Sequence, residues 1–117
     1  CFESALKIDP DHLNASSALA WTLATSPDDR VRDGERALRM ARRACELAND
    51  LPPFLELQAA ALAESGRFAE AIAVQVRALA DPRFATLVGE ADFAEAKRRL
   101  ELYRQGKPYR DATLQAD

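Results

Sequence analysis

Apolar and small residues recur along this chain three or four positions apart, in segments separated by proline, glycine and aspartate. This spacing lines one face of an α-helix. It predicts helices over about residues 1–8, 11–25, 34–48, 53–65, 68–80 and 91–105. No segment alternates as a strand would, so we expect an all-α chain. Residues 83–90 fit either a short helix or a loop broken near Gly89.

The expected helix ends carry residues that suit them. Asp9 and Pro10 stop the first helix, because proline cannot continue the hydrogen-bond ladder and restricts its predecessor. Asp11 and Asp33 are placed to cap the second and third helices by accepting from free backbone N–H groups. Asn49 follows the third helix, where a left-handed residue is common.

Each helix shows a candidate core face. The second has a stripe of Leu19, Ala20 and Leu23. The third has a longer one, made of Ala37, Leu38, Ala41, Ala44 and Cys45. In the last helix the inner face is Phe93, Ala96, Leu100 and Tyr103, and charged residues fall mostly on the other side, namely Lys97, Arg98, Arg99, Glu101 and Arg104.

A repeat organises these helices. Ala37 and Ala44 return thirty-four positions later as Ala71 and Ala78, Leu38 returns as Ile72, and Cys45 corresponds to Leu79. An interval in this range indicates stacked helix pairs, since one pair cannot bury its apolar face alone.

With these positions the chain resembles a tetratricopeptide-repeat protein. The copy PPFLELQAAALAESGRFAEAIAVQVRALADP carries the family's small residues at the helix crossing, the glycine at the turn and a late proline, here Ala59, Leu62, Gly66, Phe68, Ala71, Ala78 and Pro82. Pro82 lies one residue from the expected place. Two positions depart from the pattern. Gln58 replaces a large apolar residue and Gln75 an aromatic one, so we expect a weaker core there.

The resemblance extends over nearly the whole chain. The preceding copy is longer by five residues, in the turn TSPDDRVRDG, as in a variant common near the C-terminal ends of bacterial arrays, and RRLELYRQGKPYRD resembles a closing helix. The resemblance implies a TPR-like α-solenoid of antiparallel helix hairpins with a C-terminal capping helix. Its expected parts are the tail of a preceding repeat (1–10), a repeat with an extended turn (11–50), a second repeat (51–82), a capping segment (83–110) and a frayed tail (111–117).

Composition narrows the function classes. The 117 residues include 48% apolar and 30% charged residues with a net charge of −3, which is typical of a globular chain and unfavourable for nucleic-acid binding. The arginines at 36, 39, 42 and 43 are interpreted as a solvated face. No apolar run is long enough for a membrane helix. Because the chain starts at Cys1, we expect it to be cut from a longer protein. Its localisation stays open, with the cytoplasm favoured.

No constellation of catalytic or metal-binding residues is visible. His12 is the only histidine and Cys1 and Cys45 are far apart, which is too few ligands for a zinc site. Glu64, Glu70 and Glu95 are interpreted as helix surface, because general acid–base chemistry needs a cleft and a shifted pKa. We therefore expect a non-catalytic segment without metal or cofactor.

Trp21 is the residue that most suggests binding. It is offset from the core stripe of its helix, and in the resembling family the first helices of each repeat line a concave groove. The groove residues would then be Asn14, Ser17, Trp21, Thr25, Glu56, Ala60 and Glu64. Tryptophan is enriched at binding hot spots. The alternative is that Trp21 packs under the neighbouring helix pair, on Leu57 or beneath the long turn.

Three functions remain open from the sequence. The first is protein–protein interaction, with a protein or peptide held on the concave face. The second is a structural cap that shields the end of a longer array and contacts upstream repeats of the same chain. The third is the regulatory or interaction tail of a larger enzyme, such as a bacterial kinase or transferase.

Overall fold

The computed structural model describes residues 10–114, with side chains from Leu13 onward, and this part of the chain contains helices and no strand. The elements are α2 (Pro10–Thr25), α3 (Gly34–Leu47), α4 (Pro52–Glu64), α5 (Phe68–Ala80), α6 (Phe84–Val88), α7 (Glu90–Arg104) and the short 3-10 helix η1 (Ala112–Leu114). The all-α prediction is confirmed for the described residues. The ambiguous segment 83–90 forms the short helix α6 and turns at Gly89.

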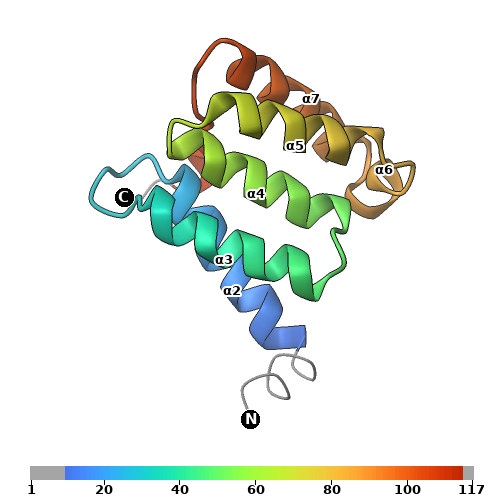
Figure 1. Ribbon diagram of the computed structural model, residues 1–117, viewed down its shortest axis with the longest axis horizontal. Coiled ribbons are helices and arrows are strands. Elements are labelled where there is room, and N and C mark those ends of the chain that lie inside the picture. Colours follow the sequence, from blue (N-terminus) through green and yellow to red (C-terminus); the bar gives the residue numbers. More distant parts are fainter. Residues whose placement is uncertain (1–9, 115–117) are drawn as a thin grey trace.

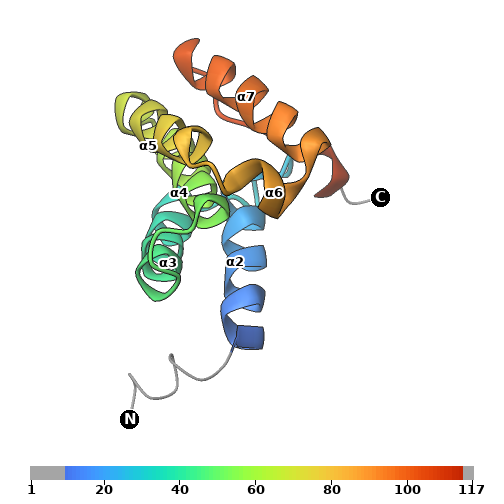
Figure 2. The same ribbon diagram turned by 90° about the vertical axis from the view of Figure 1, so that its right-hand side faces the viewer.

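The helices lie side by side in chain order (Figure 1). α2 packs against α3 and α4, α3 packs against α4, and α4 packs against α5. α7 packs against α5, and α6 packs against α7. Turned by 90°, α3, α4 and α5 form one side of the molecule, and α2, α6 and α7 lie on the other (Figure 2). The polypeptide after α7 returns toward α2 instead of continuing outward (Figure 1). This reversal places the C-terminal segment beside the first described helix.

Equivalent positions of the two hairpins are buried alike. Ala37 in α3 and Ala71 in α5 are both fully buried, in agreement with the thirty-four-residue interval. Ala20 in α2 and Ala59 in α4 are also fully buried, thirty-nine positions apart because the α2–α3 turn is longer. A methyl side chain at these positions lets neighbouring backbones approach closely. The chain is therefore helical-repeat-like in its packing as well as in its sequence.

The ends of α3 follow their sequence predictions. Asp33 caps the helix, its carboxylate accepting from the backbone N–H of Arg36 at 3.1 Å. Asn49 adopts φ 53° after the last turn, and Asp50 is left-handed as well. Gly34 opens α3 against the end of α4, where an added Cβ would lie 2.9 Å from the Ser65 hydroxyl. The small residue thus permits the two hairpins to meet at this point.

Buried apolar residues form two clusters. The larger joins α2, α3, α4 and α5 and includes Tyr103 of α7. The smaller lies under α6 and contains Cys45, Phe84 and Ala96. The core face predicted for α3 is confirmed at all five of its positions, Ala37, Leu38, Ala41, Ala44 and Cys45. Burial raises the pKa of the Cys45 thiol to about 12, as expected for a cysteine that acts as a small apolar side chain.

Several predictions of detail are wrong. Leu19, assigned to the core, is 42% exposed, and the buried stripe of α2 continues instead through Ala24. Asp11 lies inside α2, which begins at Pro10, so it is not the capping position. The start of α4 at Pro52, by contrast, is within one residue of the predicted start. The expectations for residues 1–9 and for the side chain of His12 lie outside the described residues.

Overpacking at an alanine tests the close helix approach. Ala71→Leu should lower the free energy of unfolding by about 1–3 kcal/mol, because the added atoms have no room at a fully buried contact. Urea unfolding measures the effect. Ala73→Leu on the exposed side of the same helix is the matched control and should change stability by less than about 0.5 kcal/mol. Equal effects at both positions would contradict the packing described.

Candidate interaction surface

A buried ion pair joins α4 to α7. The Arg99 Nε–H donates to Glu56 Oε2 at 2.6 Å, and an Nη of the same guanidinium also contacts that oxygen. Both side chains are nearly inaccessible, with 8% of Arg99 and 10% of Glu56 exposed. The pair corrects one sequence expectation, since Arg99 was assigned to the outer face of its helix. Glu56, expected to line a groove, is paired here and also borders the pocket described below.

Gln75 of α5 extends this polar contact to a third helix. Its fully buried amide donates to the Ala96 carbonyl of α7 at 2.9 Å and to Glu56 Oε2 at 3.4 Å. The glutamine that departs from the family pattern therefore replaces aromatic packing with hydrogen bonds between helices. Burial raises the pKa of the Glu56 carboxyl, while Arg99 and Gln75 act in the opposite direction by interacting with its charged form.

Two aromatic rings cover the guanidinium of Arg99. Its central carbon lies 5.3 Å from the ring centre of Trp21 and 4.8 Å from that of Tyr109. The two rings are themselves 5.8 Å apart and tilted by 44°. A guanidinium over aromatic faces is stabilised by the ring quadrupoles, more strongly when water is excluded. Trp21 of α2 is thereby connected to α7 and to the segment that follows it.

The C-terminal segment, residues 105–114, is bonded to the end of α2. The Asp111 N–H donates to the Thr25 carbonyl at 2.9 Å, and the Trp21 indole N–H donates to Asp111 Oδ2 at 2.7 Å. Burial acts to raise the pKa of the Asp111 carboxyl, but hydrogen bonds from Thr113 and Trp21 outweigh it and the pKa is lowered. Where the sequence predicts fraying from residue 111, residues 111–114 are held by these bonds. Residues 115–117 lie outside the described part.

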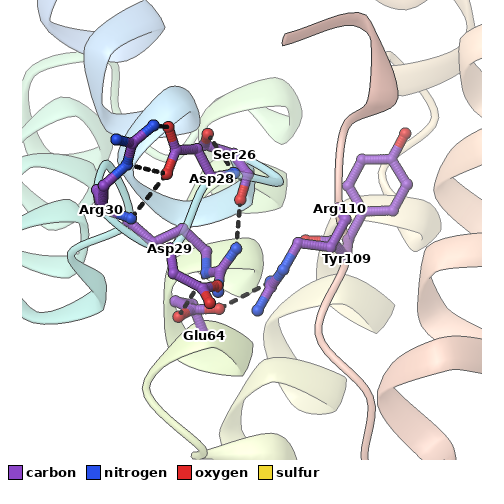
Figure 3. A network of polar contacts seen from close by, with 8 residues as sticks. Ser26, Asp28, Asp29, Arg30, Glu64, Tyr109 and Arg110 are labelled. Atoms are coloured by element: carbon purple, nitrogen blue, oxygen red, sulfur yellow. Dashed lines mark hydrogen bonds and ion pairs between the residues drawn. The ribbon is translucent and has the colours of Figure 1, made fainter. Parts of the chain in front are cut away.

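Glu64 connects the same segment to the long α2–α3 turn. Its two carboxylate oxygens face Arg110 at 2.8 Å and Arg32 at 3.4 Å. Arg32 also donates to the Ser26 carbonyl at 2.6 Å. In Figure 3, Arg110 reaches from the C-terminal segment to Glu64, whereas the ring of Tyr109 points away from it. Glu64 is thus an interior link between three parts of the chain.

A pocket of about 530 Å³ remains open beside the ion pair. Its walls come from α2, α4, α6, α7 and the C-terminal segment, and are Trp21, Pro53, Glu56, Val88, Asp92, Glu95, Arg99, Tyr109, Asp111 and Thr113. Concave sites with apolar walls and a few convergent polar groups are where proteins usually bind ligands or peptides. This pocket is therefore the candidate site of the described chain.

The structure brings together only some of the predicted groove residues. Trp21 and Glu56 line the pocket. Thr25 and Ala60 are buried, and the Thr25 hydroxyl donates to the Trp21 carbonyl. Glu64 is engaged in ion pairs, while Asn14 is exposed and Ser17 half-buried farther along α2, outside the pocket. Neither sequence interpretation of Trp21 is complete, because it both packs against the C-terminal segment and borders the opening.

Sequence reasoning missed most of the pocket. Arg99 follows Ala96 by three positions and precedes Tyr103 by four, so the helical spacing of the inner face already includes it. Asp92, Glu95 and Arg99 likewise lie on one side of α7. By contrast, nothing in the spacing signals that Tyr109 and Asp111 return to α2, since that contact joins residues ninety positions apart.

The described residues hold no group of three or more His, Cys, Asp or Glu side chains arranged to bind a metal ion. Within residues 10–114, no helix has both the length and the apolar character needed to cross a membrane. Comparisons with protein-family models, with curated proteins and with solved structures found no match to this chain.

Removing one partner of the Glu56–Arg99 pair tests how much the pair contributes to the stability of the fold. Glu56→Ala should reduce the free energy of unfolding by about 3–5 kcal/mol, because Arg99 would keep a buried charge without a counterion. Glu70→Ala is the control. It removes the partner of Arg67 in an exposed pair and should change stability by about 0–1 kcal/mol. Chemical denaturation distinguishes the two, and similar losses would show that the Glu56 pair is solvent-screened.

Trp21 is the only tryptophan, so its fluorescence reports the contact with the C-terminal segment. Tyr109→Ala should shift the emission to longer wavelength and increase quenching by acrylamide, because the indole loses the ring beside it. Lys107→Ala, an exposed position of the same segment, should leave both unchanged. An unaltered spectrum in Tyr109→Ala would mean that the segment does not cover Trp21 in solution.

Proposed function

We propose that this chain is a protein–protein interaction module of tetratricopeptide-like type, an α-solenoid segment that holds a peptide of a partner protein. The observation that carries the proposal is the pocket of about 530 Å³ on the side of α2 and α4 to which the sequence assigned the groove. Binding would use packing and hydrogen bonds, and no bond is made or broken.

Pre-organisation supports this function. The pocket walls are fixed by Arg99, Glu56 and Gln75, whose contacts join three helices. Trp21 is held by its hydrogen bond to Asp111 and by the ring of Tyr109. A wall that is already ordered loses little entropy when a ligand arrives, so a modest contact area can give specific binding.

A second candidate, the structural cap of a longer array, is favoured by a different observation. Residues of the C-terminal segment cover part of the predicted groove, with Asp111 on Thr25 and Arg110 on Glu64. A terminal repeat also needs a polar outer face, and Lys97, Arg98 and Glu101 of α7 are exposed. The two functions are compatible, since the cover leaves the pocket between α4, α6 and α7 open.

Selection of binding peptides tests the interaction function without a known partner. Random peptides displayed on phage would be selected on the chain and then measured against two tryptophan variants by fluorescence anisotropy. Glu95→Trp narrows the pocket, and Glu101→Trp is the matched control. Each glutamate lies on α7 and forms an exposed ion pair with an arginine three positions later, at 3.1 Å and 2.9 Å.

The proposal expects peptides whose affinity falls at least about tenfold in Glu95→Trp and stays unchanged in Glu101→Trp, because steric filling removes the central contact of the site. Thermal unfolding should confirm that both variants fold. Peptides that bind both variants equally, or no enriched peptide at all, would reject the pocket as a binding site and leave the capping role.

A further inference from the structure

We propose that the pocket beside the Glu56–Arg99 pair receives a basic side chain, an arginine or lysine of a partner polypeptide. This inference rests on the proposed interaction function and names the chemistry of its ligand. It follows from three properties of the pocket: the excess of carboxylates in its walls, the unavailability of its one cation, and the apolar surfaces between them.

Carboxylates outnumber cations in the walls. The walls contain one guanidinium, that of Arg99, and four carboxylates, those of Glu56, Asp92, Glu95 and Asp111. Glu56 is neutralised by this arginine and Glu95 pairs with Arg98, which leaves Asp92 and Asp111 in excess. Within residues 10–114, Asp92 and Asp111 form no ion pair, although the Asp111 carboxylate accepts hydrogen bonds from Trp21 and Thr113. Like charges gathered in one concave region raise the local concentration of a ligand of opposite charge.

Arg99 is not available to an anionic ligand. Only 8% of its side chain is exposed, and its donors face Glu56 at 2.6 Å. Both aromatic rings of the site lie over the same guanidinium. An acidic peptide would therefore meet the carboxylates of Asp92 and Asp111 without gaining a free cation. Charge complementarity selects a basic occupant and opposes an acidic one.

The remaining walls suit the shape of such a side chain. Pro53 at the start of α4 and Val88 at the end of α6 supply apolar surface, and Asp92 and Glu95 lie on the adjoining face of α7. Lysine and arginine bury an aliphatic stem against apolar groups while their charged ends reach polar ones. The pocket presents both surfaces to one entering residue.

N-acetylarginine amide and N-acetylcitrulline amide are matched probes, since they differ by the charge of the side-chain end. They would be titrated into the ¹⁵N-labelled chain while the Trp21 indole signal and the backbone signals of Asp92 and Thr113 are followed. The proposal expects these signals to move with the arginine probe, with an affinity at least about fivefold higher than for citrulline. Added salt should weaken arginine binding selectively.

Charge variants show which carboxylates of the pocket walls contribute to binding of the arginine probe. Glu95→Gln should weaken binding of the arginine probe about two- to fivefold, the range for one partly exposed charge pair. Asp92→Asn should act in the same direction. Glu101→Gln removes a carboxylate from an equivalent ion pair on α7 outside the pocket walls, and should leave the affinity unchanged.

The failures of this inference and of the proposed function are distinguishable. Equal movement with both probes, no movement with either, or equal loss in Glu95→Gln and Glu101→Gln would overturn the basic-ligand inference. The interaction function would still stand if selected peptides lacking arginine and lysine lost affinity in Glu95→Trp. It falls only if no peptide depends on the pocket.

Discussion

The ion pair between Glu56 and Arg99 is the contact on which the arrangement of the last helix depends. A charge removed from water is tolerated only when it is paired and its remaining hydrogen-bonding capacity is used. Here the carboxylate meets Arg99 of α7 and Gln75 of α5, and the guanidinium lies against two aromatic rings. Apolar packing would tolerate small sliding of α7 along α5. The directional contacts of this pair permit one placement.

The placement of α7 determines where the C-terminal segment lies. Arg99 on α7 lies against the rings of both Trp21 and Tyr109, which are also in contact with each other, so the segment that carries Tyr109 lies beside α2. Two further contacts, Asp111 on Trp21 and Arg110 on Glu64, hold it there. The segment packs against the end of α2 and also supplies one wall of the pocket that stays open. The proposed capping and binding functions would therefore involve the same residues.

The charge of the pocket has the same origin. Because the only arginine in its walls is used within the structure, the other carboxylates are left to determine what can enter. A net acidic opening arises from internal pairing and not from a run of acidic residues in the sequence. Asp92, Glu95 and Asp111 are separated along the chain and are brought together by α7 and the returning segment. Their combined field is a property of the fold.

The sequence by itself determined the helices, their order and their buried alanines, because these depend on local spacing. The faces of α3 and the interval from Ala37 to Ala71 follow from a 3.6-residue period and from the need of each hairpin to cover its neighbour. Only the tertiary structure decided that Arg99 is buried, that Gln75 bonds across helices and that Asp111 returns to Trp21. Helical periodicity cannot tell a solvated charge from a paired one, since the difference lies in a partner distant in sequence. The candidate site is built from such partners, and so its residues could be predicted only where they also lay on a helix face.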